Sequence, residues 1–227
     1  MSRCYNQSDF ADERAIMMNP ELLTCKRFTA GIIYPPLQLK PVDLNRLYAA
    51  ITERYPYQTF QHLPDGARMA NPEGDCFVQQ TRMQVNETVI NFRATKEKSM
   101  DVFRIIHDRL RIPQFLTFGI KLTAFLPFNQ PPEGTEFMEN RVLAAIKDKL
   151  ELLGDGRQGS GLRVILHRDG IHEVRIEPFF NDLSQLYVEV DVQHPTPFKS
   201  LSEVETKMEA VYNYMFGEVA RFIGSFG

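Results

Sequence analysis

The residues best placed to do chemistry in this sequence are charged side chains that alternate along predicted strands. Side chains point alternately to the two faces of a strand, so residues at every second position share one face of a sheet. Five such residues are Arg163, Arg175, Glu173, Glu189 and Asp191. Guanidinium groups bind carboxylates and other anions in a fixed geometry, so we predict a polar platform for a partner or an anionic ligand. Opposite charges on neighbouring strands also stabilise a sheet modestly, and this structural role is the alternative.

Two short motifs resemble nucleotide-binding and kinase signatures but lack the required context. Residues 154–159 match G-x-G-x-x-G, yet they follow a predicted helix and precede a predicted strand. A dinucleotide site needs the opposite order, because the phosphate binds at the helix N-terminus. The triplet 167–169, His-Arg-Asp, occurs in protein kinases, but no glycine-rich loop, strand lysine or magnesium-binding triplet accompanies it. We interpret the first motif as a helix end and the second as a turn.

The histidines show no metal-ligand pattern. Chelation needs three or four converging ligands, and His62, His107 and His194 fall in separate segments. His167 and His172 are the closest pair, but the expected strand register puts them on opposite faces of the sheet. His172 is expected to be a hydrogen-bonded residue at the edge of the core. We therefore predict no metal site, no other cofactor and no catalytic residue, and we favour a protein that is not an enzyme.

Composition and charge indicate an ordinary globular protein. Of the 227 residues, 43% are hydrophobic and 24% are charged, values typical of a folded chain with an ample core. The formal net charge of −3 argues against a nucleic-acid partner, because nucleic-acid-binding domains usually carry a basic stripe. RNA binding on the sheet would need exposed aromatic residues beside arginines, for which Phe77 and Phe92 are available.

The cysteines and the N-terminal residues favour the cytoplasm. Cys4, Cys25 and Cys76 are widely spaced without a metal-ligand pattern, so we expect reduced thiols. The first residues lack the apolar segment of a signal peptide. No apolar run approaches the roughly 20 residues that a membrane-spanning helix needs. We predict a soluble cytoplasmic protein without membrane contact.

Residues 162–192 predict three adjacent antiparallel strands. Asp169-Gly170 marks a turn between the first two strands. A three-residue loop with Gly170 at positive φ would pair Val164 with Val174, and the apolar residues would then share one face. A two-residue turn would mix the two faces, so we favour the longer loop.

The C-terminal residues predict a long helix that covers this sheet. Ser200 and Glu203 form a capping-box pattern. Apolar residues then recur at steps of three and four along one helical face. They are Leu201, Val204, Met208, Val211, Met215, Val219 and Phe222. We expect Met208 and Met215 to be buried. Tyr212, Phe216 and Ile223 flank this stripe, and some of these flanking aromatic residues are expected to meet the other half of the chain or another subunit.

The remaining segments predict further strands and helices. An edge strand is expected at residues 28–34, and a helix is expected to open at Asp43. A hairpin over residues 76–92 should have its bend at Asn86-Glu87. A second helix follows from about residue 95 to 110, and residues 116–124 form an alternating strand.

A weak internal repeat organises these elements into two units. Residues 46–55 align without gaps with residues 141–150, and both segments contain Ala-Ala-Ile within a helical pattern. The alignment predicts an α+β fold of two related helix–antiparallel sheet–helix units, which could share one continuous sheet; a chance match between two helices is the alternative. The predicted parts are an N-terminal arm at 1–27, a first unit at 28–128, a linker at 129–134 and a second unit at 135–227, which opens with a helix over 135–153.

Several short segments resemble one known family. They are Glu53-Arg54-Tyr55-Pro56, Gly74-Asp75-Cys76-Phe77-Val78-Gln79 with the following Val85-Asn86, and Val188-Glu189-Val190-Asp191 before the long terminal helix. Together they resemble a sporadically distributed prokaryotic family of about this size that has no assigned activity. The resemblance implies an architecture, and it supplies no site residues.

These observations favour a binding protein over an enzyme. We predict a non-catalytic cytosolic binding or assembly component that acts through the polar sheet face, with a protein partner or with self-association. The alternative is an enzyme or small-ligand binder whose site lies at the junction of the two units, where pockets often form.

Overall fold

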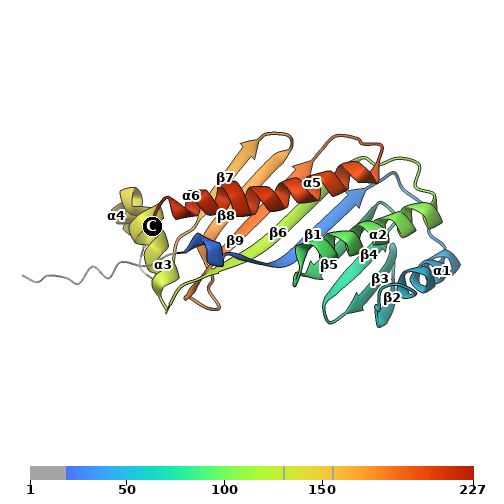
Figure 1. The fold of residues 1–227 in the computed structure, drawn as a ribbon, viewed down its shortest axis with the longest axis horizontal. Coiled ribbons are helices and arrows are strands. Elements are labelled where there is room, and N and C mark those ends of the chain that lie inside the picture. Colours follow the sequence, from blue (N-terminus) through green and yellow to red (C-terminus); the bar gives the residue numbers. More distant parts are fainter. Residues whose placement is uncertain (1–18, 130, 155) are drawn as a thin grey trace, which may run out of the picture.

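The strands of this protein join into one continuous antiparallel sheet. The computed structural model describes residues 19–129, 131–154 and 156–227, and the strand order in the sheet is β2-β3-β4-β5-β1-β6-β9-β8-β7 (Figure 1). The strands are β1 Thr24–Ile33, β2 Thr59–Leu63, β3 Gly66–Asn71, β4 Gly74–Gln79, β5 Arg82–Thr88, β6 Thr117–Pro127, β7 Leu162–His167, β8 Ile171–Pro178 and β9 Gln185–His194. The predicted α+β class and the single continuous sheet are confirmed.

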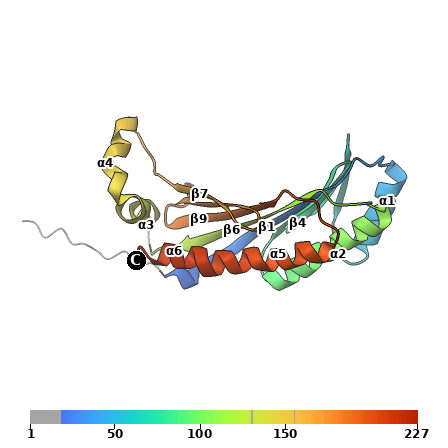
Figure 2. The ribbon, with the colours of Figure 1, turned by 90° about the horizontal axis from the view of Figure 1, so that it is seen from above.

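In the part of the chain that the structure describes, helices cover one face of this sheet and none lies over the middle of the other face. The helices are α1 Pro41–Thr52, α2 Phe92–Leu110, α3 Glu133–Phe137, α4 Lys147–Leu150, α5 Leu201–Tyr214 and α6 Ala220–Gly224. Figure 2 shows α2 and α5 on the same side of the sheet, with no helix over the central strands on the other side. We call the covered side the inner face and the uncovered side the open face. In the described part of the chain, no helix is both long enough and apolar enough to cross a membrane.

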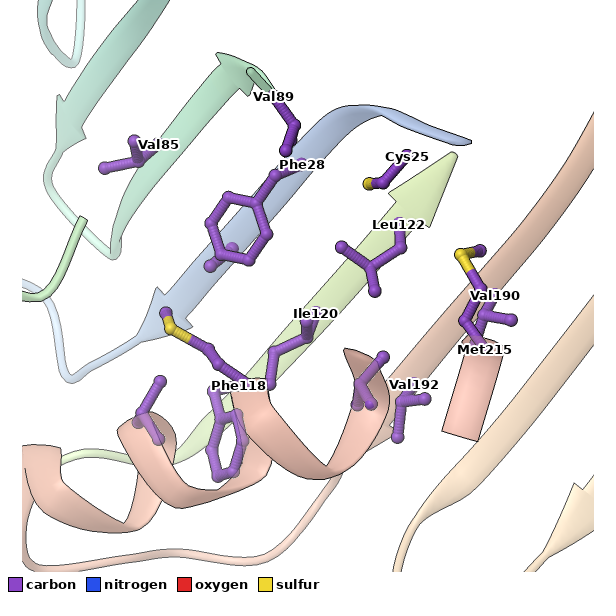
Figure 3. Close-up of a cluster of buried hydrophobic side chains, with 14 of the residues drawn as sticks. Cys25, Phe28, Val85, Val89, Phe118, Ile120, Leu122, Val190, Val192 and Met215 are labelled. Atoms are coloured by element: carbon purple, nitrogen blue, oxygen red, sulfur yellow. The ribbon is translucent and has the colours of Figure 1, made fainter. Parts of the chain in front are cut away.

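The core lies between the inner face and the two long helices. Alternate residues of the central strands point into it, and Phe28, Ile120 and Val190 are at most 1% exposed. Met208 and Met215 of the C-terminal helical segment are fully buried, and Figure 3 shows Met215 beside Val190. The burial of both methionines confirms the sequence prediction. The sheet therefore has an apolar side fixed by packing and a polar side free for contacts.

The β7–β8 hairpin has the predicted register but not the predicted glycine conformation. Val164 pairs with Val174, and the loop contains three residues, as expected. His167 lies on the open face, whereas His172 lies on the inner face and is 5% exposed. Gly170 is not at positive φ, so that prediction is wrong. Glycine is needed there for a close approach, because a Cβ on Gly170 would lie 2.8 Å from the carbonyl oxygen of Gln193.

The C-terminal helix begins as predicted but changes its geometry near its end. Both hydrogen bonds of the predicted capping box are present at its first turn. Residues Met215–Val219 form a π-helical segment, which holds one more residue per turn than an α-helix. The buried side therefore moves on by one position, so that Ile223 is 1% exposed and Phe222 is 41% exposed. The prediction that Phe222 continues the buried stripe is wrong.

The side of this helix next to α2 joins the two halves of the chain. The ring of Tyr212 stacks on that of Phe92 at the start of α2, with centroids 4.0 Å apart. Lys96 of α2 also forms an ion pair with Glu209 of α5. The expectation that a flanking aromatic residue contacts the other half is confirmed.

Two predictions in the N-terminal half are wrong. The strand expected at the edge is β1, which lies at the centre and pairs with both β5 and β6. It begins at Thr24, so the end of the predicted arm at 1–27 belongs to the sheet, while residues 1–18 lie outside the described residues.

The bend of the next hairpin falls between β4 and β5 at Gln80-Thr81 and not at Asn86-Glu87. The alternation continues through Glu87, which is 6% exposed on the inner face.

The helix predicted over 135–153 is broken into short pieces. A π-helical segment (Met138–Val142), 3-10 turns (Ala144–Ile146 and Glu151–Leu153) and α4 follow α3. Only residues near Phe137 are buried, so packing does not hold the later turns in one helix. Gly154 ends the segment at φ 112°, as expected for a helix stop. The predicted linker at 129–134, whose Gln130 lies outside the described residues, runs directly into α3 at Glu133.

Candidate functional site on the open face

All five residues predicted to form a polar platform lie on the open face. Residues that face each other across an antiparallel pair point to the same side. Arg175 faces both Arg163 on β7 and Glu189 on β9. Glu173 faces Asp191 in the same way. The sheet thus brings together charged residues from three strands, as the alternation predicts.

These charges are largely satisfied within the protein. Arg163 donates two hydrogen bonds to Glu173, at 2.7 and 2.6 Å, and these bonds lower the pKa of the Glu173 carboxyl group. Arg175 lies 3.7 Å from Glu173 and 4.0 Å from Glu189. Both arginines therefore have acidic neighbours, and an anionic ligand would have to compete with them.

Buried hydroxyl and carboxyl groups continue this network toward the centre of the sheet. Tyr187 donates a hydrogen bond to Glu189, which is 7% exposed although it lies on the open face. Burial and the neighbouring carboxylate raise the pKa of Tyr187 to about 12. Lys121 on β6 lies 3.2 Å from Asp191 and 3.7 Å from Glu189. Lys121 is a member of the platform that sequence reasoning did not single out.

A hollow lies on the open face where the two middle strands meet, near the C-terminal end of β1 and the N-terminal end of β6. Gly31 of β1 faces Gly119 of β6 in the register of the sheet. Gln84 of β5 and Gln193 of β9 face these glycines from the two outer sides. The hollow has a volume of about 250 Å³, and Arg82 and Lys121 also line it. Glycine inside a strand often marks a place where a ligand or another backbone approaches closely.

The side chains at this hollow differ in how far they can move. A Cβ on Gly119 would lie 2.5 Å from the Oε1 atom of Gln193, which covers that glycine. A Cβ on Gly31 would lie 3.7 Å from its nearest neighbours, including the Oε1 atom of Gln84. Both obstacles are ends of flexible side chains. An approaching group can therefore reach the backbone of the two central strands by moving only glutamine side chains.

The N-terminal half of the open face carries a second hydrogen-bond network. Asn86 accepts hydrogen bonds from Thr29 and Gln84, both at 2.9 Å, and donates one to Asp75 at 2.6 Å. Asp75 also accepts two hydrogen bonds from Arg68. The two halves of the open face thus have similar chemistry, with carboxylates held by neighbouring donors.

Positive and negative charges are nearly balanced over the whole open face. Its basic residues are Arg27, Arg68, Arg82, Lys121, Arg163 and Arg175, and its acidic residues are Asp75, Glu173, Glu177, Glu189 and Asp191. Among the described residues, Arg27 and Arg82 make no ion pair. The face has no basic stripe of the kind that follows a phosphate backbone.

A second cavity, of about 440 Å³, lies on the inner side beside α5. Asp169 in the β7–β8 loop accepts a hydrogen bond from Lys207 of α5 at 2.7 Å and lies 2.9 Å from Nε2 of His172. His194 of β9 donates from Nδ1 to the carbonyl oxygen of Asp169 at 3.0 Å. The hydrogen bond from Lys207 holds the pKa of Asp169 well below its usual range. We call these four residues the Asp169 clasp, because they tie the loop to α5.

The Asp169 clasp is better suited to holding structure than to chemistry. Nδ1 of His172 and Nε2 of His194 have no hydrogen-bond partner in the described part of the chain, and both atoms are closed off from solvent. A ligand in the cavity cannot reach them without a rearrangement. Burial lowers the pKa of His194, which keeps its ring neutral. Among the residues that the structure describes, no group of three or more His, Cys, Asp or Glu is placed to hold a metal ion.

Comparisons with known proteins give no family assignment. No protein-family model matches the chain. No curated protein matches it either.

Sequence reasoning found the charged platform but not the central hollow. Gly31 and Gly119 are far apart in the chain, and only the pairing of β1 with β6 brings them together. The signal in the sequence was a glycine at a position of the polar face in each of two strands whose residues alternate between apolar and polar. That signal has no meaning until the two strands are known to be neighbours.

Proposed function

We propose that this protein is a non-catalytic binding or assembly component and that a partner docks on its open face. The observation that carries this proposal is the hollow at Gly31 and Gly119 in the middle of a polar, helix-free sheet face. A partner's backbone or a flat side chain approaches most closely where two facing residues have no side chains. The surrounding carboxamides of Gln84 and Gln193 offer both donors and acceptors to such a group.

The charge balance favours a protein partner over a nucleic acid. Affinity for nucleic acid comes mainly from cations that neutralise phosphates, and most cations of the open face already have an acidic neighbour. Of the cations on the open face, only Arg27 and Arg82 make no ion pair with a described residue. Interfaces between proteins have a polar rim around a closely packed centre, and on this proposal the charged residues around the hollow form the rim.

A small polar ligand in the hollow is the second candidate. The hollow is lined by β1 and β6 of the predicted first unit (28–128) and by Asp191 and Gln193 of β9 in the predicted second unit, so it reaches the junction that the sequence suggested for such a site. Its volume of about 250 Å³ is just below the usual range for ligand pockets, about 300–1,000 Å³. A ligand there would have to be small and would contact amide and hydroxyl groups together with the charged Arg82, Lys121 and Asp191.

Site-specific photocrosslinking in the source cells tests the docking face. A benzophenone side chain replaces Gln84 or Gln193 on the open face, and in the control it replaces Arg93, whose side chain is 86% exposed on α2. We expect one discrete protein adduct from both open-face positions and none from Arg93. Adducts that form equally well at Arg93, or no adduct at either glutamine, would contradict the proposal. In the second case, extra mass on the native protein in mass spectrometry would favour the small ligand.

A pair of glycine substitutions adds a matched control. Gly31→Leu fills the hollow and should abolish the adduct while leaving the melting temperature nearly unchanged, because only flexible side-chain atoms and one carbonyl oxygen lie near its Cβ, at 3.7 Å. Gly217→Leu places the same side chain in the π-helical segment Met215–Val219, where a Cβ meets nothing within 4 Å, and should leave the adduct intact. An adduct that survives Gly31→Leu would remove the hollow from the interface.

The two halves of the sheet are also proposed to derive from one duplicated unit. Each half runs from a central strand through a helical segment and a meander to a long helix: β1, α1, β2–β5 and α2, then β6, α3–α4, β7–β9 and α5. The strand order is mirrored about the β1–β6 pair, except that the first half has one more outer strand. On this proposal each unit begins at its central strand, not at the helix that the sequence alignment used.

We also propose that the protein belongs to the sporadically distributed prokaryotic family and that it is located in the cytoplasm. Two observations support the second: Cys25 and Cys76 are both free and buried, and burial raises the pKa of the Cys25 thiol to about 12, so it stays protonated and unreactive. Fractionation of the source cells tests it, because recovery of the protein outside the cytoplasm would contradict it.

A further inference from the structure

The strand β7 ends the sheet, and no described strand pairs with its outer edge. Proteins usually guard such edges with lysine, proline or a covering element, and β7 has neither residue among its six positions. Arg163 is its one fixed charge, and two hydrogen bonds to Glu173 hold that side chain against β8. The other edge strand, β2, is packed against a helix on its inner side, because the ring of Phe60 stacks on that of Tyr48 of α1 with centroids 4.8 Å apart.

An apolar groove runs along the inner side of the β7 edge. It has a volume of about 230 Å³, and its lining includes Leu162, Val164 and Leu166 of β7 together with Phe222. Phe222 is 41% exposed because of the π-helical segment, and Leu166 is 36% exposed. On the open side of the same strand, Ile165 is 51% exposed. Unpaired backbone beside an apolar groove fits an extended strand whose apolar residues recur at every second position.

We propose that the occupant is β7 of a second copy of this chain, paired antiparallel about a twofold axis at Val164. In this register Val164 faces its own equivalent and Leu162 faces Leu166, so all three inner residues meet apolar partners. On the open side, Arg163 faces Ile165 and no two like charges are directly opposed. The edge strand is thus complementary to itself.

The twofold arrangement also closes the assembly. A head-to-tail contact of β7 with β2 would leave a free edge at each end and continue into a filament, whereas a contact of β7 with β7 uses one surface twice and stops at two copies. The dimer would hold one sheet across both chains, with both open faces on the same side.

The size of the contact sets the expected affinity. One six-residue strand and its neighbouring side chains from each copy bury on the order of 1,000 Å² in total, the lower limit for a specific interface. We therefore expect a reversible dimer with a dissociation constant on the order of 10 µM. The inference is independent of what binds to the open face, since β7 contributes no residue to the central hollow.

Sedimentation equilibrium tests this dimer with a matched pair of variants. The mass should rise from one copy to two between about 1 µM and about 500 µM protein. Ile165→Lys places a lysine opposite Arg163 of the second copy and should raise the dissociation constant at least about tenfold. Ile33→Lys changes an equally exposed isoleucine on the open face, at 45%, and should leave the dimer intact. A chain that stays monomeric throughout, or an equal loss with both variants, overturns the proposal.

A cysteine at the axis tests the register. In a Cys4→Ser background, Val164→Cys should form a cross-linked dimer on mild oxidation, because directly opposed Cβ atoms lie about 4.5–5.5 Å apart. Gln61→Cys on the other edge strand is the control and should stay monomeric. Circular dichroism confirms that each variant is folded. A folded Val164→Cys protein that does not cross-link at concentrations where the dimer forms overturns the pairing about Val164.

Discussion

The neighbouring residues Phe222 and Ile223 give a direct test of how the C-terminal helix covers the sheet. A regular α-helix would bury Phe222, which continues the apolar stripe through Met215. The π-helical segment Met215–Val219 instead turns Ile223 inward, to 1% exposure, and leaves Phe222 at 41%. The order in which alanine substitutions at these two positions destabilise the protein should therefore be the reverse of what the sequence pattern predicts.

The magnitudes follow from the burial of each side chain. Ile223→Ala leaves a cavity in a closed part of the core and should lower the free energy of unfolding by about 2–5 kcal/mol. Phe222→Ala should lower it by only about 1–2 kcal/mol, because full burial of such a side chain is worth about 1.5–3 kcal/mol and much of this ring is in water. Urea unfolding followed by circular dichroism at about 1 µM protein measures both without a contribution from the dimer. A larger loss from Phe222→Ala than from Ile223→Ala would show that the helix is regular and that the π-helical segment is absent.

Two further predictions concern the contacts that hold the two halves and the β7–β8 loop. Burial lowers the pKa of His194 in the folded protein below its ordinary 6.5, so the unfolded chain binds a proton at this histidine more readily than the folded protein does. The stability that the neutral ring contributes is therefore complete above about pH 6.5 and is lost as the pH falls through the folded pKa. The melting temperature of the wild type should drop more steeply between pH 7 and pH 5 than that of His194→Phe, and equal slopes would exclude His194 as the cause. A double-mutant cycle with Tyr212→Ala and Phe92→Ala should give a coupling of about 0.5–1.5 kcal/mol for the stacked pair, and additive effects would show that this stack does not join the halves.

Local periodicity explains which parts of the fold the sequence predicts. Strand alternation gave the register of β7 with β8, because only one pairing puts Val164 and Val174 on a common apolar side. The three- and four-residue spacing and the Ser200 capping box gave the start and the buried face of α5. The same alternation placed the five charged residues on one face. Each of these signals lies within about 30 residues of chain.

The parts that could not be predicted depend on distant segments. β1 looks like an edge strand in the sequence, because nothing in residues 24–33 reveals that β5 and β6 will pair with it on both sides. The central hollow has the same origin, since it exists only when Gly31 meets Gly119. The helix expected at 135–153 failed for the opposite reason: its helical pattern is present, but too little of it is buried to hold one continuous helix.

On the proposal that a partner docks on the open face, the ion pairs of that face favour the hollow as the point of closest contact. On β9 the inner residues Val188 and Val190 are fully buried, so their substitution should affect stability. Glu189, the open-face residue between them, forms ion pairs with Lys121 and Arg175. Recruiting Arg163 or Arg175 for an anionic ligand therefore means breaking contacts with acidic neighbours. Docking at the hollow breaks no ion pair, because the backbone at Gly31 is uncovered and only glutamine side chains must move. For this reason a partner is expected to make its closest contact between the two central strands, with the arginine cluster forming the rim of the interface.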